Sequence, residues 1–162
     1  MAAPIRFGII GLGYWGQLLL QCLQALAAVD IRWVCDVNEG VVETTARQVD
    51  AARWTTAWEE MMADPDLDAV CVVTPEHMHL APVKAALAAG KHVFIEKPIA
   101  TTLEEAEEMA AAAAQADTFV MPGHIMRFDP RYVLLRQHIE GGRFGQVASV
   151  QTRRHMRRSL TR

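Results

Sequence analysis

A glycine-rich run near the start of the chain has the spacing that binds the pyrophosphate of a dinucleotide. It reads Gly11-Leu12-Gly13-Tyr14-Trp15-Gly16, a G-x-G-x-x-G pattern. In this pattern the first glycine permits a tight turn, the second lets the backbone approach a phosphate, and the third lets a helix pack closely on a strand. The free N–H groups and the dipole at the start of that helix favour phosphate charge. The run therefore predicts a phosphate-binding turn, with all six of its residues in the cofactor site.

A carboxylate lies where this kind of site needs one. Asp36 follows residues 31–35, which read as a strand, and lies about 20 residues beyond the last glycine of the run. A carboxylate there accepts hydrogen bonds from both ribose hydroxyls and repels a 2′-phosphate. No Arg or Lys lies between Asp36 and Arg47 to neutralise such a phosphate. The pattern thus favours NAD over NADP. The alternative is a glycine turn that binds nothing, with Asp36 simply beginning a helix.

The elements around these residues have the right order to position them. Residues 5–10, rich in Ile and Phe, predict a buried strand interrupted by Gly8, and residues 17–28 have apolar side chains at helical spacing. The same alternation continues along the chain. It predicts strands at 31–35, 53–54, 68–73, 92–95 and 118–121, and helices at 41–49, 56–63, 79–89 and 103–115. Strands and helices in strict alternation predict an α/β fold with a doubly wound parallel sheet, the Rossmann fold.

Local signals mark several of the helix ends. Thr56 and Thr102 each precede a glutamate by three residues, as in a capping box. Asn38 is a candidate cap for the second helix, and Gly90 is a candidate terminator for the fourth. These signals support the predicted boundaries.

The last part of the chain reads as the beginning of a second domain. Asp129-Pro130 predicts the start of a helix that ends at Gly141, and residues 147–152 alternate as in a strand. We therefore assign residues 1–122 to a dinucleotide-binding domain. Residues 123–162 are expected to be a hinge helix and the first strand of an incomplete substrate domain.

Five polar clusters follow predicted strands, where ligands of doubly wound sheets bind. They are residues 11–16, Asp36, residues 74–79, residues 96–98 and residues 123–127. In these positions the sequence resembles the Gfo/Idh/MocA family of NAD(P)-dependent oxidoreductases. The matching stretches are the glycine run, Thr74-Pro-Glu-His-Met-His79, Ala89-Gly-Lys-His-Val-Phe-Ile-Glu-Lys-Pro98, Gly123-His-Ile-Met-Arg-Phe-Asp-Pro130 and Ile139-x-x-Gly142-x-x-Gly145.

The resemblance implies a Rossmann domain followed by an α/β domain, and hydride transfer at a hydroxyl-bearing carbon of a sugar, polyol or nucleotide-sugar. It implies that Lys97 is the active-site lysine, donating to the nicotinamide ribose and the substrate hydroxyl and stabilising an alkoxide. Glu96 is expected to hold this lysine and the ribose. Pro98 fixes the turn, often through a cis bond in this family. The resemblance also places Thr74, Pro75 and His79 along the adenine and ribose side of the cofactor, and Arg127 near the nicotinamide.

One departure from the family concerns acid–base catalysis. The family supplies an Asp and a His in a D-x-x-x-H pattern beyond the point where this sequence stops, and no residue here matches that His. Two interpretations follow: the cofactor-binding portion of a dehydrogenase, inactive alone, or a stand-alone NAD-binding module without catalysis of its own. The first is preferred because residues 123–152 resemble a hinge. Family members usually associate through the second domain, so a homo-oligomer is expected.

The composition disfavours several other classes of protein. With 51% hydrophobic and 22% charged residues, no apolar run near the roughly 20 residues of a membrane span and no signal peptide, a cytoplasmic protein is expected. Cys22, Cys35 and Cys71 lie in apolar segments and read as reduced core thiols. The arginine-rich tail lacks interleaved aromatic residues, so nucleic-acid binding is disfavoured. His77 and His79 form a possible metal pair without obvious partners, and no metal site is predicted.

Overall fold

The computed structural model describes residues 3–153. The chain divides into two compact units, Met1–His124 and Ile125–Arg162. Within the described residues, the six-stranded sheet lies in the first unit, and the second unit contains a short 3₁₀ turn and one α-helix. The assignment of residues 123–162 to a substrate domain stays a prediction.

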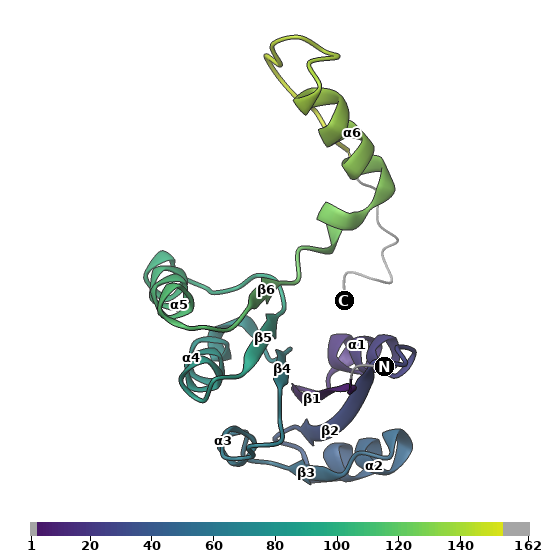
Figure 1. The fold of residues 1–162 in the computed structure, drawn as a ribbon, viewed down its shortest axis with the longest axis vertical. Coiled ribbons are helices and arrows are strands. Elements are labelled where there is room, and N and C mark those ends of the chain that lie inside the picture. Colours follow the sequence, from purple (N-terminus) through teal and green to yellow (C-terminus); the bar gives the residue numbers. More distant parts are fainter. Residues whose placement is uncertain (1–2, 154–162) are drawn as a thin grey trace. The chain divides into compact units, whose positions relative to one another are not determined.

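The first unit is built on a six-stranded parallel sheet (Figure 1). Its strands, in spatial order, are β3 (Arg53–Thr55), β2 (Val29–Cys35), β1 (Ile5–Ile10), β4 (Ala69–Val72), β5 (His92–Ile95) and β6 (Val120–Pro122). The order reverses between β1 and β4, which pair directly. Ligands of doubly wound sheets bind outside the carboxyl ends of the strands at such a reversal. The predicted fold class is confirmed.

Helices cover both faces of this sheet, as Figure 1 shows. They are α1 (Tyr14–Gln24), α2 (Glu39–Val49), α3 (Glu59–Met62), α4 (Leu80–Ala88) and α5 (Leu103–Gln115), with a short 3₁₀ turn η1 (Glu76–Met78) before α4. Successive strand side chains point to opposite faces. Ile9 and Cys71 therefore pack in a core with α1 and α2, whereas Ile10 and Val72 pack in a core with α3, α4 and α5. Strand β4 is buried along its whole length.

Several predicted boundaries are corrected. Helix α1 begins at Tyr14 rather than residue 17, because extended Gly13 is its N-cap, and it ends at Gln24 rather than residue 28. The capping box expected at Thr56 is wrong. Instead Thr55 Oγ1 donates to Glu60 Oε2 at 2.8 Å and accepts from the Ala57 N–H at 3.0 Å. By contrast, Asn38 and Thr102 do cap α2 and α5 through their side-chain oxygens.

The second unit holds a 3₁₀ turn, η2 (Ile125–Phe128), and helix α6 (Pro130–Glu140). Asp129 caps α6 as predicted, accepting from the Arg131 N–H at 2.9 Å. The strand predicted at 147–152 is not formed. A strand is stabilised by hydrogen bonds to a neighbour, and these residues pair with none in the described part of the chain. Val147 and Val150 are accordingly exposed.

The three cysteines are free thiols. Burial raises the pKa of Cys35 and of Cys71 to about 12, so both stay protonated and unreactive at neutral pH. Cys22 is exposed, which corrects its expected place in the core. It lies on the solvent side of α1, whose buried side chains are Leu20 and Leu23.

A buried carboxylate ties the segment between α3 and β4 to strand β2. Asp64 accepts from Trp33 Nε1 at 2.7 Å and from Arg32 Nε at 2.9 Å, and its side chain is 3% exposed. Burial alone would raise the pKa of Asp64, but the hydrogen bonds from Trp33 and Arg32 outweigh it and hold that pKa well below its usual range.

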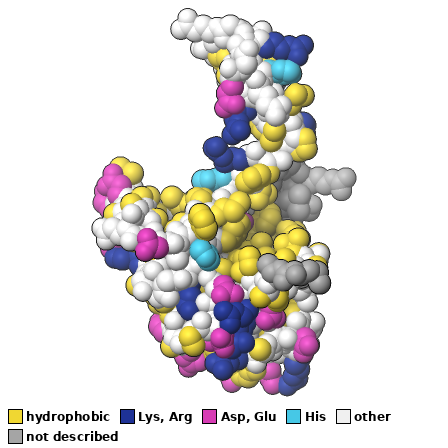
Figure 2. Space-filling model, viewed as in Figure 1, with side chains coloured by type: hydrophobic (Ala, Val, Ile, Leu, Met, Phe, Trp, Pro, Cys, Tyr) yellow, Lys and Arg dark blue, Asp and Glu magenta, His cyan; other side chains and the backbone are white. Residues whose placement is uncertain are grey.

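On the visible face of the first unit, basic and acidic side chains are interspersed (Figure 2). Within residues 3–153 no helix is long and apolar enough to cross a bilayer.

Candidate functional site

Four of the predicted clusters lie at the carboxyl ends of the sheet strands. The glycine-rich turn follows β1 and Asp36 follows β2. Thr74 lies two residues after the end of β4, and Lys97 lies two residues after the end of β5. Since β1, β2, β4 and β5 are neighbours and parallel, these residues share one edge. Arg127 lies in the second unit, where it borders a pocket of about 240 Å³ with Met126, Tyr132 and Arg136.

The three glycines of the turn are required for three different reasons. Gly11 has φ +96°, and a Cβ there would lie 2.7 Å from the Val73 carbonyl oxygen. A Cβ on Gly16 would lie 2.0 Å from the Gly11 carbonyl oxygen, so α1 could not pack so close to the turn. A Cβ on Gly13 would meet nothing within 4 Å. The chain's own packing therefore does not explain Gly13, whereas a phosphate that must reach the backbone does.

Asp36 holds the glycine-rich turn as well as facing the site. Its Oδ2 accepts from the Leu12 N–H at 2.7 Å, and its Oδ1 accepts from the Asn38 N–H at 3.0 Å. Each carboxylate oxygen has further lone pairs, so the group can still accept from a ribose. Leu12 is 3% exposed and its N–H is already used. Leu12 therefore holds the turn to Asp36, and its expected contact with the cofactor stays a prediction.

A buried hydroxyl beside the turn has no partner. Thr74 Oγ1 is buried and makes no hydrogen bond within the described residues. Buried hydroxyls are nearly always hydrogen-bonded, so this one is suited to a ligand group. The first N–H groups of α1 likewise have no acceptor within their own helix. With the open space at Gly13, these donors fit an anionic dinucleotide at this edge.

His79 is buried, with 1% of the residue exposed, and its predicted contact with the cofactor stays a prediction. Its Nε2 lies 2.8 Å from the Thr74 carbonyl oxygen and its Nδ1 lies 3.2 Å from the Ile99 carbonyl oxygen. The ring therefore joins the segment after β4 to the segment after β5. Pro75, in contrast, is exposed at this edge.

Lys97 meets the glycine-rich turn through an aromatic ring. Its Nζ lies 5.2 Å from the centre of the Trp15 ring, and Trp15 packs edge-on against Tyr14 with ring centres 5.5 Å apart. Glu96 is expected to hold this lysine in position, and its Oε2 accepts from the backbone N–H of Lys97 at 2.8 Å. The Lys97–Pro98 bond is cis.

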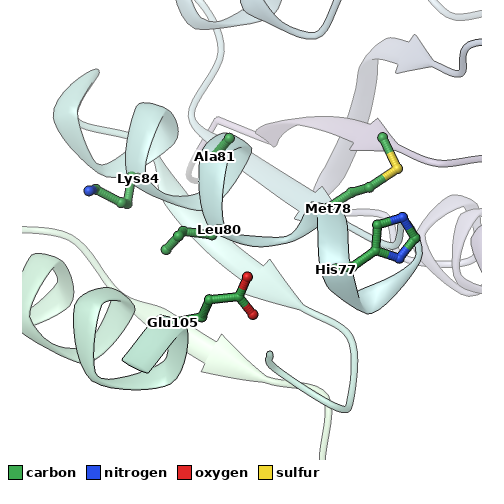
Figure 3. Close-up of a pocket in the computed structure, with 6 residues that line it drawn as sticks. All are labelled: His77, Met78, Leu80, Ala81, Lys84 and Glu105. Atoms are coloured by element: carbon green, nitrogen blue, oxygen red, sulfur yellow. The ribbon is translucent and has the colours of Figure 1, made fainter. Parts of the chain in front are cut away.

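A larger pocket of about 500 Å³ lies elsewhere on the first unit, between α4 and α5 (Figure 3). It is lined by His77, Met78, Leu80, Ala81, Lys84 and Glu105, none of them predicted site residues. Hydrogen bonds from Thr101 lower the pKa of Glu105, so this carboxylate is ionised and already partnered. Across residues 3–153, no three His, Cys, Asp or Glu side chains are grouped as metal ligands.

Known proteins share this arrangement. Residues 5–124 match the model of the oxidoreductase family with an NAD-binding Rossmann fold, Gfo/Idh/MocA. An inositol 2-dehydrogenase of Acidothermus cellulolyticus is 36% identical over 87% of this chain and 42% of its own length. A 2,7-anhydro-N-acetylneuraminate hydratase of Escherichia coli is 32% identical over 93% of this chain and 40% of its own length.

A solved structure is similar as well. Scyllo-inositol dehydrogenase from Lactobacillus casei, with bound cofactor NAD(H) and scyllo-inositol, has a TM-score of 0.83 at 29% identity, covering 88% of this chain and 42% of that one. The chain thus spans about two fifths of the length of these relatives. The family model covers most of the chain, and the glycine-rich turn, Asp36 and Lys97 all fall within it. The chain belongs to the Gfo/Idh/MocA family of NAD-binding oxidoreductases.

Proposed function

We propose that this chain is the cofactor-binding part of an NAD-dependent dehydrogenase that oxidises a hydroxyl-bearing carbon of a sugar, polyol or nucleotide-sugar. The observation that carries the proposal is the contact between Lys97 and Trp15. The cation that follows β5 lies against the turn that we predict to bind phosphate. The scyllo-inositol dehydrogenase that resembles this chain was solved with NAD(H) and a polyol, which supports the substrate class.

The role of Lys97 follows from its charge and position. An ammonium donates hydrogen bonds and stabilises negative charge that develops on an oxygen. In the proposed reaction it donates to the substrate hydroxyl and stabilises the alkoxide as the C–H bond breaks. The hydroxyl proton passes to a base, which the family's D-x-x-x-H pattern would supply from polypeptide outside these 162 residues. A bound nicotinamide would supply the hydride acceptor.

The proposed preference for NAD over NADP depends on Asp36. Both of its carboxylate oxygens accept backbone N–H groups, so the side chain is held in place beside the turn. A fixed negative charge there favours ribose hydroxyls and repels a 2′-phosphate. Fluorescence titration of the chain with NADH and NADPH tests this preference. Equal dissociation constants for the two would remove it.

The decisive experiment is Lys97→Ala in the complete enzyme, with Lys84→Ala as the matched control. Lys84 pairs with Glu108, away from the proposed site. Removing a donor to a developing oxyanion costs roughly a hundredfold or more in kcat, so the Lys97 variant should lose at least that much. Its dissociation constant for NADH should stay within about threefold of wild type, because the phosphate-binding turn is unchanged.

The assay should follow NADH formation over a panel of inositols, sugars and nucleotide-sugars. Product analysis should accompany it, because one relative is named a hydratase. Near wild-type turnover by the Lys97 variant would show that the residue is structural. NADH binding without any turnover by the complete protein would instead support the alternative prediction, an NAD-binding module without catalysis.

A further inference from the structure

Trp15 is an aromatic residue that the fold itself does not require. It is the second variable position after Gly13 in the glycine-rich turn, at the start of α1, and it is 46% exposed. The buried residues of α1 are Gly16, Leu20 and Leu23, so Trp15 does not anchor the helix. Its neighbour Tyr14 is 73% exposed. The contacts of this exposed ring therefore need an explanation other than packing of the helix.

The partner is the ammonium of Lys97, 5.2 Å from the ring centre. A cation within about 6 Å of an indole face is attracted by the electron density of the ring. The other two lysines are held differently: Lys84 pairs with Glu108, and Lys91 Nζ donates to the Asp64 carbonyl at 2.7 Å. Within the described residues, Lys97 Nζ lies against an aromatic face rather than against an oxygen.

This difference matters for the proposed chemistry. A carboxylate partner would accept the N–H groups of the ammonium and compete with a substrate for them. An aromatic face attracts the charge through the electron density of its ring, and it has no oxygen lone pairs to accept the N–H groups. Trp15 therefore holds the lysine at the edge of the glycine-rich turn and leaves its N–H donors available.

We propose that Trp15 is a positioning residue for Lys97, holding the ammonium over its indole ring in the geometry in which it donates to substrate. This rests on the proposed function of Lys97. A cation–π contact at an exposed site is weak, so the expected effect is modest. Trp15→Leu should lower kcat roughly two- to fivefold in the complete enzyme. Trp15→Phe keeps an aromatic face and should retain most of the activity.

A first measurement detects the contact without any enzymatic assay. The chain contains only Lys84, Lys91 and Lys97 as lysines, so ¹³C-lysine labelling gives a simple NMR spectrum. The Cε–H signals of Lys97, assigned through Lys97→Arg, should be shifted by the Trp15 ring current. Trp15→Leu should remove that shift. Trp54→Leu is the matched control, because Trp54 is 42% exposed on β3 and should leave the shift in place.

A second measurement separates the electron density of the ring from its shape. Fluorinated tryptophans incorporated at position 15 of the complete enzyme weaken the cation–π attraction with little change in size. The proposal expects kcat to fall stepwise with the number of fluorines, while the dissociation constant for NADH changes less than twofold. A ring that only fills space would give no such series.

The outcomes are distinct. If Trp15→Leu leaves the Lys97 signals unmoved, the contact does not exist and the proposal is wrong. If those signals move but kcat is the same across the fluorinated series, Trp15 touches Lys97 without positioning it, which also overturns the proposal. If Lys97→Ala is itself fully active, the proposed function fails, and this is recognised separately because the NMR contact would still be present.

Discussion

Replacing Gly13 by alanine should separate cofactor binding from folding. The Cβ of the new residue enters open space, with nothing within 4 Å, and the local φ of −66° suits alanine. Alanine is a poorer helix cap than glycine, which destabilises the fold. Gly→Ala also reduces the conformational entropy of the unfolded chain, which stabilises the fold by about 0.4–1 kcal/mol. These effects oppose each other. The free energy of unfolding of Gly13→Ala should therefore lie within about 1 kcal/mol of wild type.

Cofactor binding should respond much more strongly. The same open space is where a phosphate would approach the N–H groups at the start of α1, and the added methyl group blocks it. Hydrogen bonds to a charged group contribute about 1.5–3 kcal/mol. Loss of one corresponds to a dissociation constant for NADH that rises about ten- to a hundredfold. Fluorescence titration with NADH measures this, and urea unfolding followed by circular dichroism measures stability.

Gly16→Ala is the contrasting variant. Its Cβ would lie 2.0 Å from the Gly11 carbonyl oxygen, which is backbone and cannot move aside cheaply. Overpacking of this kind costs about 1–3 kcal/mol or more, so stability and binding should fall together. Wild-type affinity for NADH in Gly13→Ala would refute the assignment of the open space to phosphate. Equal destabilisation by the two variants would refute the steric argument.

Three further predictions concern other parts of the first unit. Asp36→Asn removes the charge that opposes a 2′-phosphate, so the ratio of the NADPH and NADH dissociation constants should fall at least about fivefold in titrations. Thr74→Val removes an unpartnered hydroxyl; stability should stay within about 1 kcal/mol of wild type, while NADH binding weakens about two- to tenfold. Asp64→Ala leaves the Trp33 N–H buried without its acceptor and should cost about 2–4 kcal/mol in urea unfolding at pH 7. Because the pKa of Asp64 is lowered in the folded state, its contribution is present above about pH 4 and is lost as the pH falls further, so the stabilities of wild type and variant should converge in acid.

Much of the first unit could be predicted from the sequence, because its signals are local. The turn after β1 needs its glycines within six residues, and α2, α5 and α6 are capped by side chains that lie two or three residues from the N–H they accept. The alternation of apolar strands with amphipathic helices likewise determines the fold class, since each element must bury one face. Asp36 was found by its spacing from the glycines.

The contacts that define the site were decided by tertiary structure. Asp36 binds the Leu12 N–H across 24 positions, and His79 reaches Ile99 across 20. Trp15 and Lys97 come from opposite ends of the first unit's sequence and meet because β1 and β5 flank β4 in the sheet. No local pattern encodes such pairs. For the same reason the alternating residues 147–152 form no strand: alternation shows which side chains could face a core, but pairing requires a neighbouring strand, and only the folded chain determines whether one is there.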